Sequence, residues 1–141
     1  MRPAVFFGLI MAVLNKQKLA LVRRSIRLHG EQGQYASIDN GVRRDLWFTV
    51  EPSRQNQNED RTEFDNDRLE VTFLRDESDT FYPGVNELQQ GDEFVRDPTH
   101  DARASDGPFT FKGEVIESDQ VSYTIVVERY VNLSQSRGVR G

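Results

Sequence analysis

The sequence predicts an all-β fold, a small antiparallel β-barrel or sandwich, with one amphipathic helix near the N-terminus and a long inter-strand loop. Alternating apolar and polar runs carry this prediction, and turn residues such as Asn40-Gly41 and Gly91-Asp92 separate them. The runs cover residues 34–38, 42–50, 69–75, 93–96, 109–116 and 121–131. Short strands with this spacing are typical of small barrels and sandwiches.

The chain has 141 residues, which fits one domain. We expect an apolar extension over 1–14, a single barrel domain over 15–131 and a polar tail over 132–141. Because the chain has no cysteine, disulfides and thiolate chemistry are excluded. The two histidines, His29 and His100, are far apart and offer little for a zinc site or a catalytic triad. We therefore expect no enzyme activity, no cofactor and no metal.

Charge is distributed unevenly along the chain, whose net charge is -5. The first 30 residues carry six basic residues and no acid, whereas the remainder carries 12 basic and 23 acidic residues. A basic N-terminal segment is thus followed by an acidic remainder of the chain. Broad binding to nucleic-acid phosphates needs a footprint rich in Lys and Arg, so we expect any DNA contact to be local.

The apolar start MRPAVFFGLIMAVL (1–14) allows three interpretations. It is an over-extended start whose true initiator is Met11, an apolar segment packed on a partner, or an export signal. The run is too short to span a bilayer as a helix, and we expect no membrane association.

Residues 15–28, NKQKLALVRRSIRL, show a helical pattern. Asn15 is a suitable N-cap, and Leu19, Val22 and Ile26 share one face. The basic residues of this segment, mostly on other faces, are Lys16, Lys18, Arg23, Arg24 and Arg27. We interpret them as a docking surface for an acidic partner or DNA phosphates. The alternative is a solvated helix face laid over the barrel.

We expect Gly30 and Gly33 to end the helix, after which the pattern changes to that of strands. In the run 42–50, alternation places Trp47 and Thr49 on one face and, on the other, Val42, Leu46, Phe48 and Val50. Trp47 is therefore a candidate rim or interface aromatic, with burial in the core as the alternative.

The segment 52–67 contains one aromatic residue, no aliphatic residue and many amides and charges, so it adds little to a core. We expect a long loop here, and a loop of this length in a compact domain is usually functional or disordered.

Two function classes follow from individual residues. Exposed Trp47, Phe81 and Tyr82 would form the platform of a ligand-binding β-sandwich module. A metal-dependent hydrolase would use the loop 97–106, with Asp97, His100, Asp101 and Asp106 as ligands, although an exposed turn explains these residues equally well.

A third class follows from a resemblance. The basic helix at 15–28, the Asn-Gly hairpin, the polar loop, the LQQGDEF turn at 88–94 and the final SYTIVVERYV strand together resemble small head-closure or head-tail joining proteins of tailed bacteriophages. The resemblance spans most of 15–131 and consists of strand order and length. It implies a structural virion protein with a β-barrel that joins the portal side of the capsid to the tail, and a loop that in some members closes the DNA channel.

The resemblance also implies partners and a location. The chain would form a homo-oligomeric ring, a hexamer or a dodecamer, in the virion neck after assembly in the bacterial cytoplasm. A portal or adaptor protein would lie on the head side and a tail protein on the other, and double-stranded DNA would pass without sequence-specific binding. The channel-loop candidates are Arg54, Gln55, Asn56, Gln57 and Asn58. A lining without a Lys/Arg stripe lets phosphates slide past.

Overall fold

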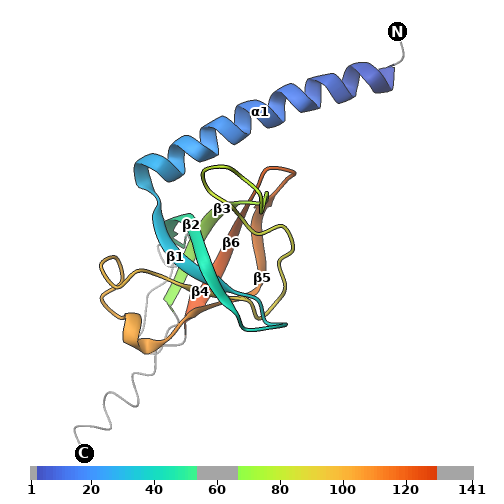
Figure 1. Cartoon of the computed structure of the whole chain (residues 1–141). Helices are drawn as coiled ribbons and strands as arrows, with labels where there is room; N and C mark the ends of the chain where they lie inside the picture. The colour runs from blue at the N-terminus through green and yellow to red at the C-terminus, as the bar shows by residue number, and fades with distance from the viewer. Residues whose placement is uncertain (1–2, 54–66, 130–141) are drawn as a thin grey trace, which may run out of the picture.

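The computed structural model describes residues 3–53 and 67–129. Within them, one α-helix precedes six antiparallel strands that close a barrel in the order β1-β2-β3-β6-β5-β4. The elements are α1 (Pro3–His29), β1 (Glu31–Ala36), β2 (Arg43–Pro52), β3 (Asp67–Leu74), β4 (Glu93–Val95), the 3-10 turn η1 (Ala104–Asp106), β5 (Phe109–Ser118) and β6 (Ser122–Arg129). Figure 1 shows α1 lying across one side of this barrel. The predicted β fold with an N-terminal helix is confirmed, and it is a barrel.

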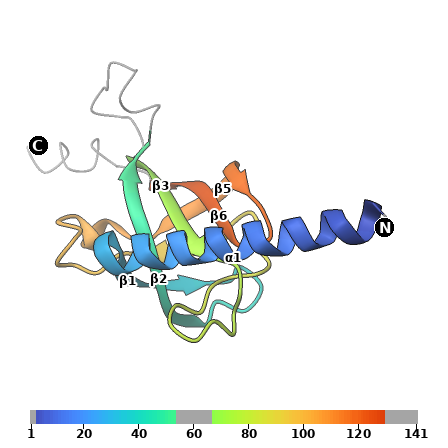
Figure 2. The same ribbon diagram turned by 90° about the horizontal axis from the view of Figure 1, so that it is seen from above.

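The predicted start of the helix at Asn15 is wrong. The helix begins at Pro3, which is tolerated in a first turn, and continues through Asn15 to His29. Asn15 does not cap the helix; its Nδ2 donates to Oε1 of Gln120 at 2.8 Å. The expected boundary after residue 14 therefore falls inside one continuous helix, whose N-terminal half runs clear of the strands in Figure 2.

The first hairpin is present, but its connection is wider than the predicted tight Asn-Gly turn, and the role of Gly33 is corrected. Gly41 has φ +68° whereas Asn40 has no positive φ, and residues 37–42 separate the paired Ala36 and Arg43. The first strand begins earlier than predicted, at Glu31, so Gly33 lies inside it. A Cβ on Gly33 would meet the carbonyl oxygen of Val95 and the ring of Phe48, so this strand requires glycine there.

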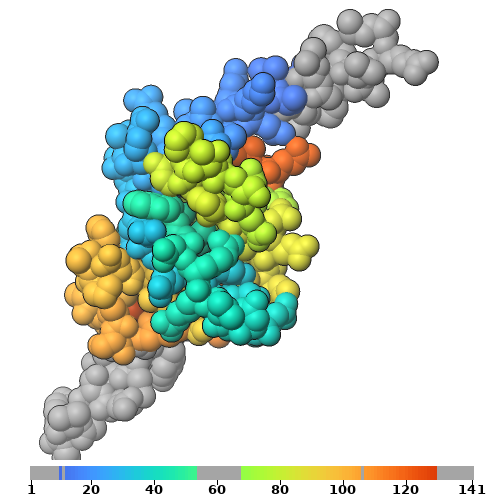
Figure 3. Space-filling view, viewed as in Figure 1, coloured from blue at the N-terminus to red at the C-terminus, as the bar shows by residue number. Residues whose placement is uncertain are grey.

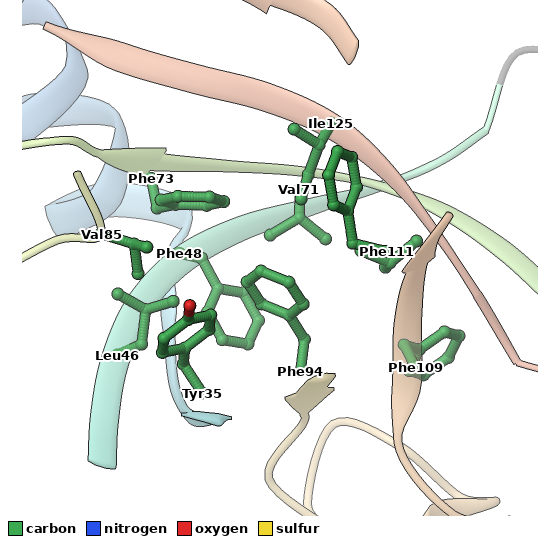
Figure 4. Packing of buried hydrophobic residues seen from close by; sticks show 11 residues of the cluster. Tyr35, Leu46, Phe48, Val71, Phe73, Val85, Phe94, Phe109, Phe111 and Ile125 are labelled. Atoms are coloured by element: carbon green, nitrogen blue, oxygen red, sulfur yellow. The ribbon is translucent and has the colours of Figure 1, made fainter. Parts of the chain in front are cut away.

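The barrel interior holds the main hydrophobic core, shown in Figure 4. Its buried members are Tyr35, Leu46, Phe48, Val71, Phe73, Val85, Phe94, Phe109, Phe111, Ile125 and Val127. Leu46 and Phe48 point inward, as the alternation in β2 predicts, while Val42 lies outside the strand and is exposed. Apolar burial on this scale is the dominant stabilising term of the fold.

Half of β5 lies beyond its neighbour β4. The short strand β4 pairs with β5 only at Phe109 and Thr110. The register of β5 against β6 then shifts after Phe111, where Gly113 has φ +109°, as expected for a bulge. The following residues, 114–118, are exposed and have register partners only in β6.

The predicted loop 52–67 lies between β2 and β3. Its ends are strand residues, because Pro52 belongs to β2 and Asp67 to β3. Pro52 is in register with Leu69, and Asp67 with Arg129 at the end of β6, so both stems lie at one end of the barrel. The candidates Arg54, Gln55, Asn56, Gln57 and Asn58 and the predicted tail lie outside the described residues.

Candidate docking surface

The inner face of α1 is fixed to the barrel by a second apolar cluster. Val22 and Ile26 of the helix are buried against Leu74 at the end of β3. Leu19, Trp47, Tyr82 and Val121 pack around this cluster. In Figure 3 the yellow-green segment after β3 lies against the blue helix. Because the buried residues recur at helical spacing, the predicted face of Leu19, Val22 and Ile26 is the one that meets the barrel.

An ion pair between Arg23 and Asp79 fixes one flank of the helix. Asp79 is buried, and its Oδ2 accepts backbone N–H groups from Phe81 at 3.1 Å and Tyr82 at 2.8 Å. Burial acts to raise the pKa of Asp79, but the hydrogen bonds from Arg23 and from these two backbone groups outweigh it and hold the pKa below its usual value. Asp79 is therefore an ionised anchor for the helix.

Lys18 fixes the opposite flank by pairing with Glu117 and Asp119. Asp119 also closes the β5–β6 turn, because its Oδ1 accepts the N–H of Val121 at 2.8 Å and of Ser122 at 3.0 Å. Burial opposes the charged form of Lys18, but the two carboxylates outweigh it and raise the pKa of Lys18. The helix is thus tied to the β5–β6 hairpin by charge as well as by apolar contact.

These pairs divide the five predicted docking residues into two groups. Lys18 and Arg23 bind the chain's own carboxylates. Lys16, Arg24 and Arg27 are exposed and have no ion-pair partner among the described residues. A docking role stays a prediction, and these last three are the residues available for it.

Trp47 lies on the outer face of β2, opposite Leu46 and Phe48, as alternation predicts. It is half-buried beneath α1, with its ring edge-on to Tyr82 at 5.7 Å between centroids. The ring of Phe81 is exposed and lies under the Arg23 guanidinium, 5.4 Å away. Trp47 and Tyr82 therefore support the helix, and an interface role for Trp47 stays a prediction.

The solvent side of α1 carries an uncovered row of large apolar residues. We call this row the outer stripe; its members are Ile10, Leu14, Leu21 and Leu28. Their exposed fractions lie between 41% and 66%, which is high for four aliphatic side chains in one row. This stripe was not predicted because the helix was expected to begin at residue 15, which left Ile10 and Leu14 outside it.

A groove of about 600 Å³ runs between the outer stripe and the barrel. Leu14, Leu21 and Ile116 supply apolar wall. Polar and acidic side chains of the strands form the other side, namely Thr49, Glu51, Glu70, Thr72, Glu117 and Thr124. Lys18 also lines the groove and pairs with Glu117, so the exposed carboxylate that a partner could meet there is that of Glu51. The groove therefore suits an apolar element that brings a basic side chain to Glu51.

Two further apolar patches lie on the barrel. Val115 and Ile116 are exposed on the outer half of β5. Ile38 and Val42 are exposed at the β1–β2 turn. Together with the outer stripe, these patches give this small protein several exposed apolar areas where another protein could bind.

The loop 97–106 uses two of its predicted metal ligands internally. Asp97 accepts the N–H and the hydroxyl of Thr99, both at 2.9 Å. Asp101 binds the buried Arg129 at 2.7 Å. The described residues contain no group of three or more His, Asp or Glu side chains arranged to hold a metal ion. The side chain of Asp106 lies outside the described residues.

A buried carboxylate also organises the LQQGDEF turn. Asp92 is fully buried and accepts hydrogen bonds from the Tyr35 hydroxyl at 2.7 Å and from the backbone N–H groups of Ile38 and Gln89, both at 2.9 Å. Burial, followed by the bond to Asp92, raises the pKa of Tyr35 far above its usual value. Because Asp92 satisfies three donors from three segments, its role is structural.

Among the described residues, no helix combines the length and apolarity needed to cross a membrane. No family model, curated protein or solved structure matches this chain. The fold and the surface therefore define its class by themselves. It is a small closed β-barrel with a helix tied across its outside, and that helix leaves an apolar stripe uncovered.

Proposed function

We propose that this chain is a structural protein of the tailed-phage neck, a head-closure or head-tail joining subunit that forms a ring between the portal side of the capsid and the tail. The observation that carries the proposal is the uncovered apolar surface on an otherwise closed barrel. Contiguous exposed apolar groups mark protein contacts in soluble proteins. A protein that works by assembly needs such contacts and needs no reactive site.

A closed ring requires two unlike surfaces that meet head to tail. The β5 patch of Val115 and Ile116 and the turn patch of Ile38 and Val42 are candidates for these two surfaces. The outer half of β5 strengthens the first candidate, because a strand with a neighbour on one side only can accept a further backbone partner. Either a hexamer or a dodecamer is compatible with this proposal.

The partners follow from charge. Lys16 and Arg27 remain available on α1 for an acidic surface of the portal, adaptor or tail protein. The acidic balance of residues 31–141 disfavours a grip on DNA phosphates, so DNA would pass through the ring without specific binding. The polar segment containing Arg54, Gln55, Asn56, Gln57 and Asn58 would line or close the channel, and the location would be the virion neck.

The two alternatives lose support from the side chains that would serve them. A ligand platform needs accessible rings, but Trp47 and Tyr82 are half-buried under α1. A metal-dependent hydrolase needs free ligands, but Asp101 is committed to Arg129 and Asp97 to its own turn. We therefore consider both alternative functions less well supported than the neck-protein function.

Deletion of the gene from its phage tests the proposal. The expected result is DNA-filled or emptied heads and separate, complete tails in electron micrographs of the lysate, with infectivity restored by the gene supplied in trans. Normal tailed and infectious particles without the protein would contradict a neck function.

A further inference from the structure

We infer that α1 pairs in an antiparallel manner with the α1 of a second copy of this chain, through the outer stripe. The inference goes beyond the proposed function and does not depend on it. A two-fold contact closes at two copies and is not the head-to-tail contact of a ring.

The spacing of the outer stripe is that of a coiled coil. Ile10, Leu14, Leu21 and Leu28 fall on steps of four and seven, and Gln17 and Arg24 occupy the two intervening positions of the same heptad pattern. Between residues 10 and 28 this row covers about 27 Å of helix at 1.5 Å per residue. Such a row is built to meet another helix side by side.

The barrel leaves room for that second helix. The face of α1 that carries Val22 and Ile26 is buried against the barrel, while Leu21 and Leu28 are among the most exposed apolar residues. A second α1 can therefore lie along the outer stripe with its own barrel on the far side. The two helices would lie side by side, each with its inner face on its own barrel.

Charge selects the antiparallel direction. The helix has no charged residue between Pro3 and Leu14, whereas its second half carries exposed Lys16, Arg24 and Arg27. A parallel pair would place Arg24 against Arg24, and like charges at a buried position destabilise an interface. The antiparallel register places Arg24 opposite Leu14, and Leu28 opposite Ile10, so each basic half lies against an uncharged half.

The groove beside the outer stripe is complementary to another α1. Its barrel side carries exposed Glu51 and the Glu117 that pairs with Lys18, and its apolar side carries Leu14 and Leu21. In the antiparallel register the partner's Arg24 arrives at the level of Leu14, one turn from the Lys18–Glu117 pair. An apolar and basic helix fits this groove, and α1 is such a helix.

Cysteine cross-linking tests the direction directly, because the chain contains no cysteine. Ile10→Cys and Leu28→Cys are prepared as separate proteins, and each is oxidised alone and in an equimolar mixture. The inference predicts a disulfide-linked dimer in the mixture, with yields several-fold lower for each protein alone. Strong linkage of each protein alone would indicate a parallel pair, and no linkage in the mixture would exclude this contact; either result overturns the inference.

The oligomeric state tests the surface. Sedimentation of the wild-type protein should show a dimer, and Leu14→Glu with Leu21→Glu should convert it to a monomer. Ile38→Glu with Val42→Glu is the matched control, since it adds the same charge at another apolar patch and should leave the dimer intact. A monomeric wild type, or a dimer that responds only to the control, would overturn the inference.

A variant that strengthens the dimer tests the inference even if the Glu variant fails to fold. Gln17→Leu with Arg24→Leu completes the heptad row and should tighten the dimer at least tenfold. An unchanged dissociation constant in this variant would contradict pairing through the outer stripe.

Discussion

The Nε–H of Arg23 donates to Oδ1 of Asp79 at 3.1 Å, which joins the C-terminal part of α1 to a carboxylate that is almost completely buried. The same carboxylate holds the backbone N–H groups of Phe81 and Tyr82. Asp79 therefore couples the position of the helix to the fold of the segment that follows β3. Two of the basic residues of α1, Lys18 and Arg23, therefore attach the helix to its own barrel.

Loss of the Arg23 side chain should therefore destabilise the monomer. We expect Arg23→Gln to lower the free energy of unfolding by about 2 kcal/mol, because a buried carboxylate loses its charged donor. Arg27→Gln is the matched control, since Arg27 is exposed and lies outside the outer stripe, and its effect should stay within about 0.5 kcal/mol. Urea unfolding followed by tryptophan fluorescence measures both, because Trp47 packs beside the helix. Equal effects of the two substitutions would contradict this anchoring role.

Stability should fall at acid pH because three aspartates that pair with basic side chains have lowered pKa values. Despite burial, which acts to raise them, hydrogen bonds to Arg23, Arg129 and Lys18 hold the pKa of Asp79, Asp101 and Asp119 below 3.8. A lowered pKa contributes stability above the unfolded value, and that contribution is lost as pH falls through the folded value. The free energy of unfolding should therefore decline below about pH 4. The decline should be shallower in Asp79→Asn; an identical acid profile would show that Asp79 does not contribute.

The carboxylate of Asp92 should contribute more to the free energy of unfolding than the hydroxyl of Tyr35, which donates to it. Asp92→Ala leaves the Tyr35 hydroxyl and two backbone N–H groups without their acceptor, and we expect a loss of about 3 kcal/mol or more. Tyr35→Phe removes one of the three bonds and should cost about 1 kcal/mol. Chemical unfolding of the two variants gives the comparison. A larger loss for Tyr35→Phe would reverse this order and contradict the role given to Asp92.

Much of the strand pattern could be predicted from the sequence, because alternation is a local property. Leu46 and Phe48 point inward as predicted, and the Asn40-Gly41 turn joins β1 to β2. The start of the helix could not be placed, because Asn15 has the chemistry of an N-cap and its true partner, Gln120, is distant in sequence. The length of an apolar helix also depends on what covers it, which local pattern does not describe.

The environment of the candidate docking residues could be predicted only in part. The basic residues of the helix could be listed, but their division depends on Asp79 and Asp119, which long-range strand pairing brings to the helix. No local pattern reveals that Lys18 and Arg23 are already paired. The spacing of the outer stripe, by contrast, was readable in the sequence once the helix was extended to Pro3.

Reversal of the exposed helix charges separates docking from folding. We expect Lys16→Glu with Arg27→Glu to leave the melting temperature within about 2 °C, since both residues are exposed and exposed charges contribute little to folding. Incorporation into phage particles should fall at least tenfold, because charge complementarity sets partner choice. Particle-associated protein is measured by immunoblot after gradient purification. Normal incorporation with normal melting would remove the docking role from these residues.

The most direct test of the neck assignment is to count and locate the protein in purified particles. Quantitative mass spectrometry against the portal protein should give six or twelve copies per virion, and cryo-electron microscopy of the same particles should show the six-stranded barrel, with its helix, in a ring between portal and tail. Complete, infectious particles that lack this protein, or that carry it elsewhere than the neck, would contradict the account.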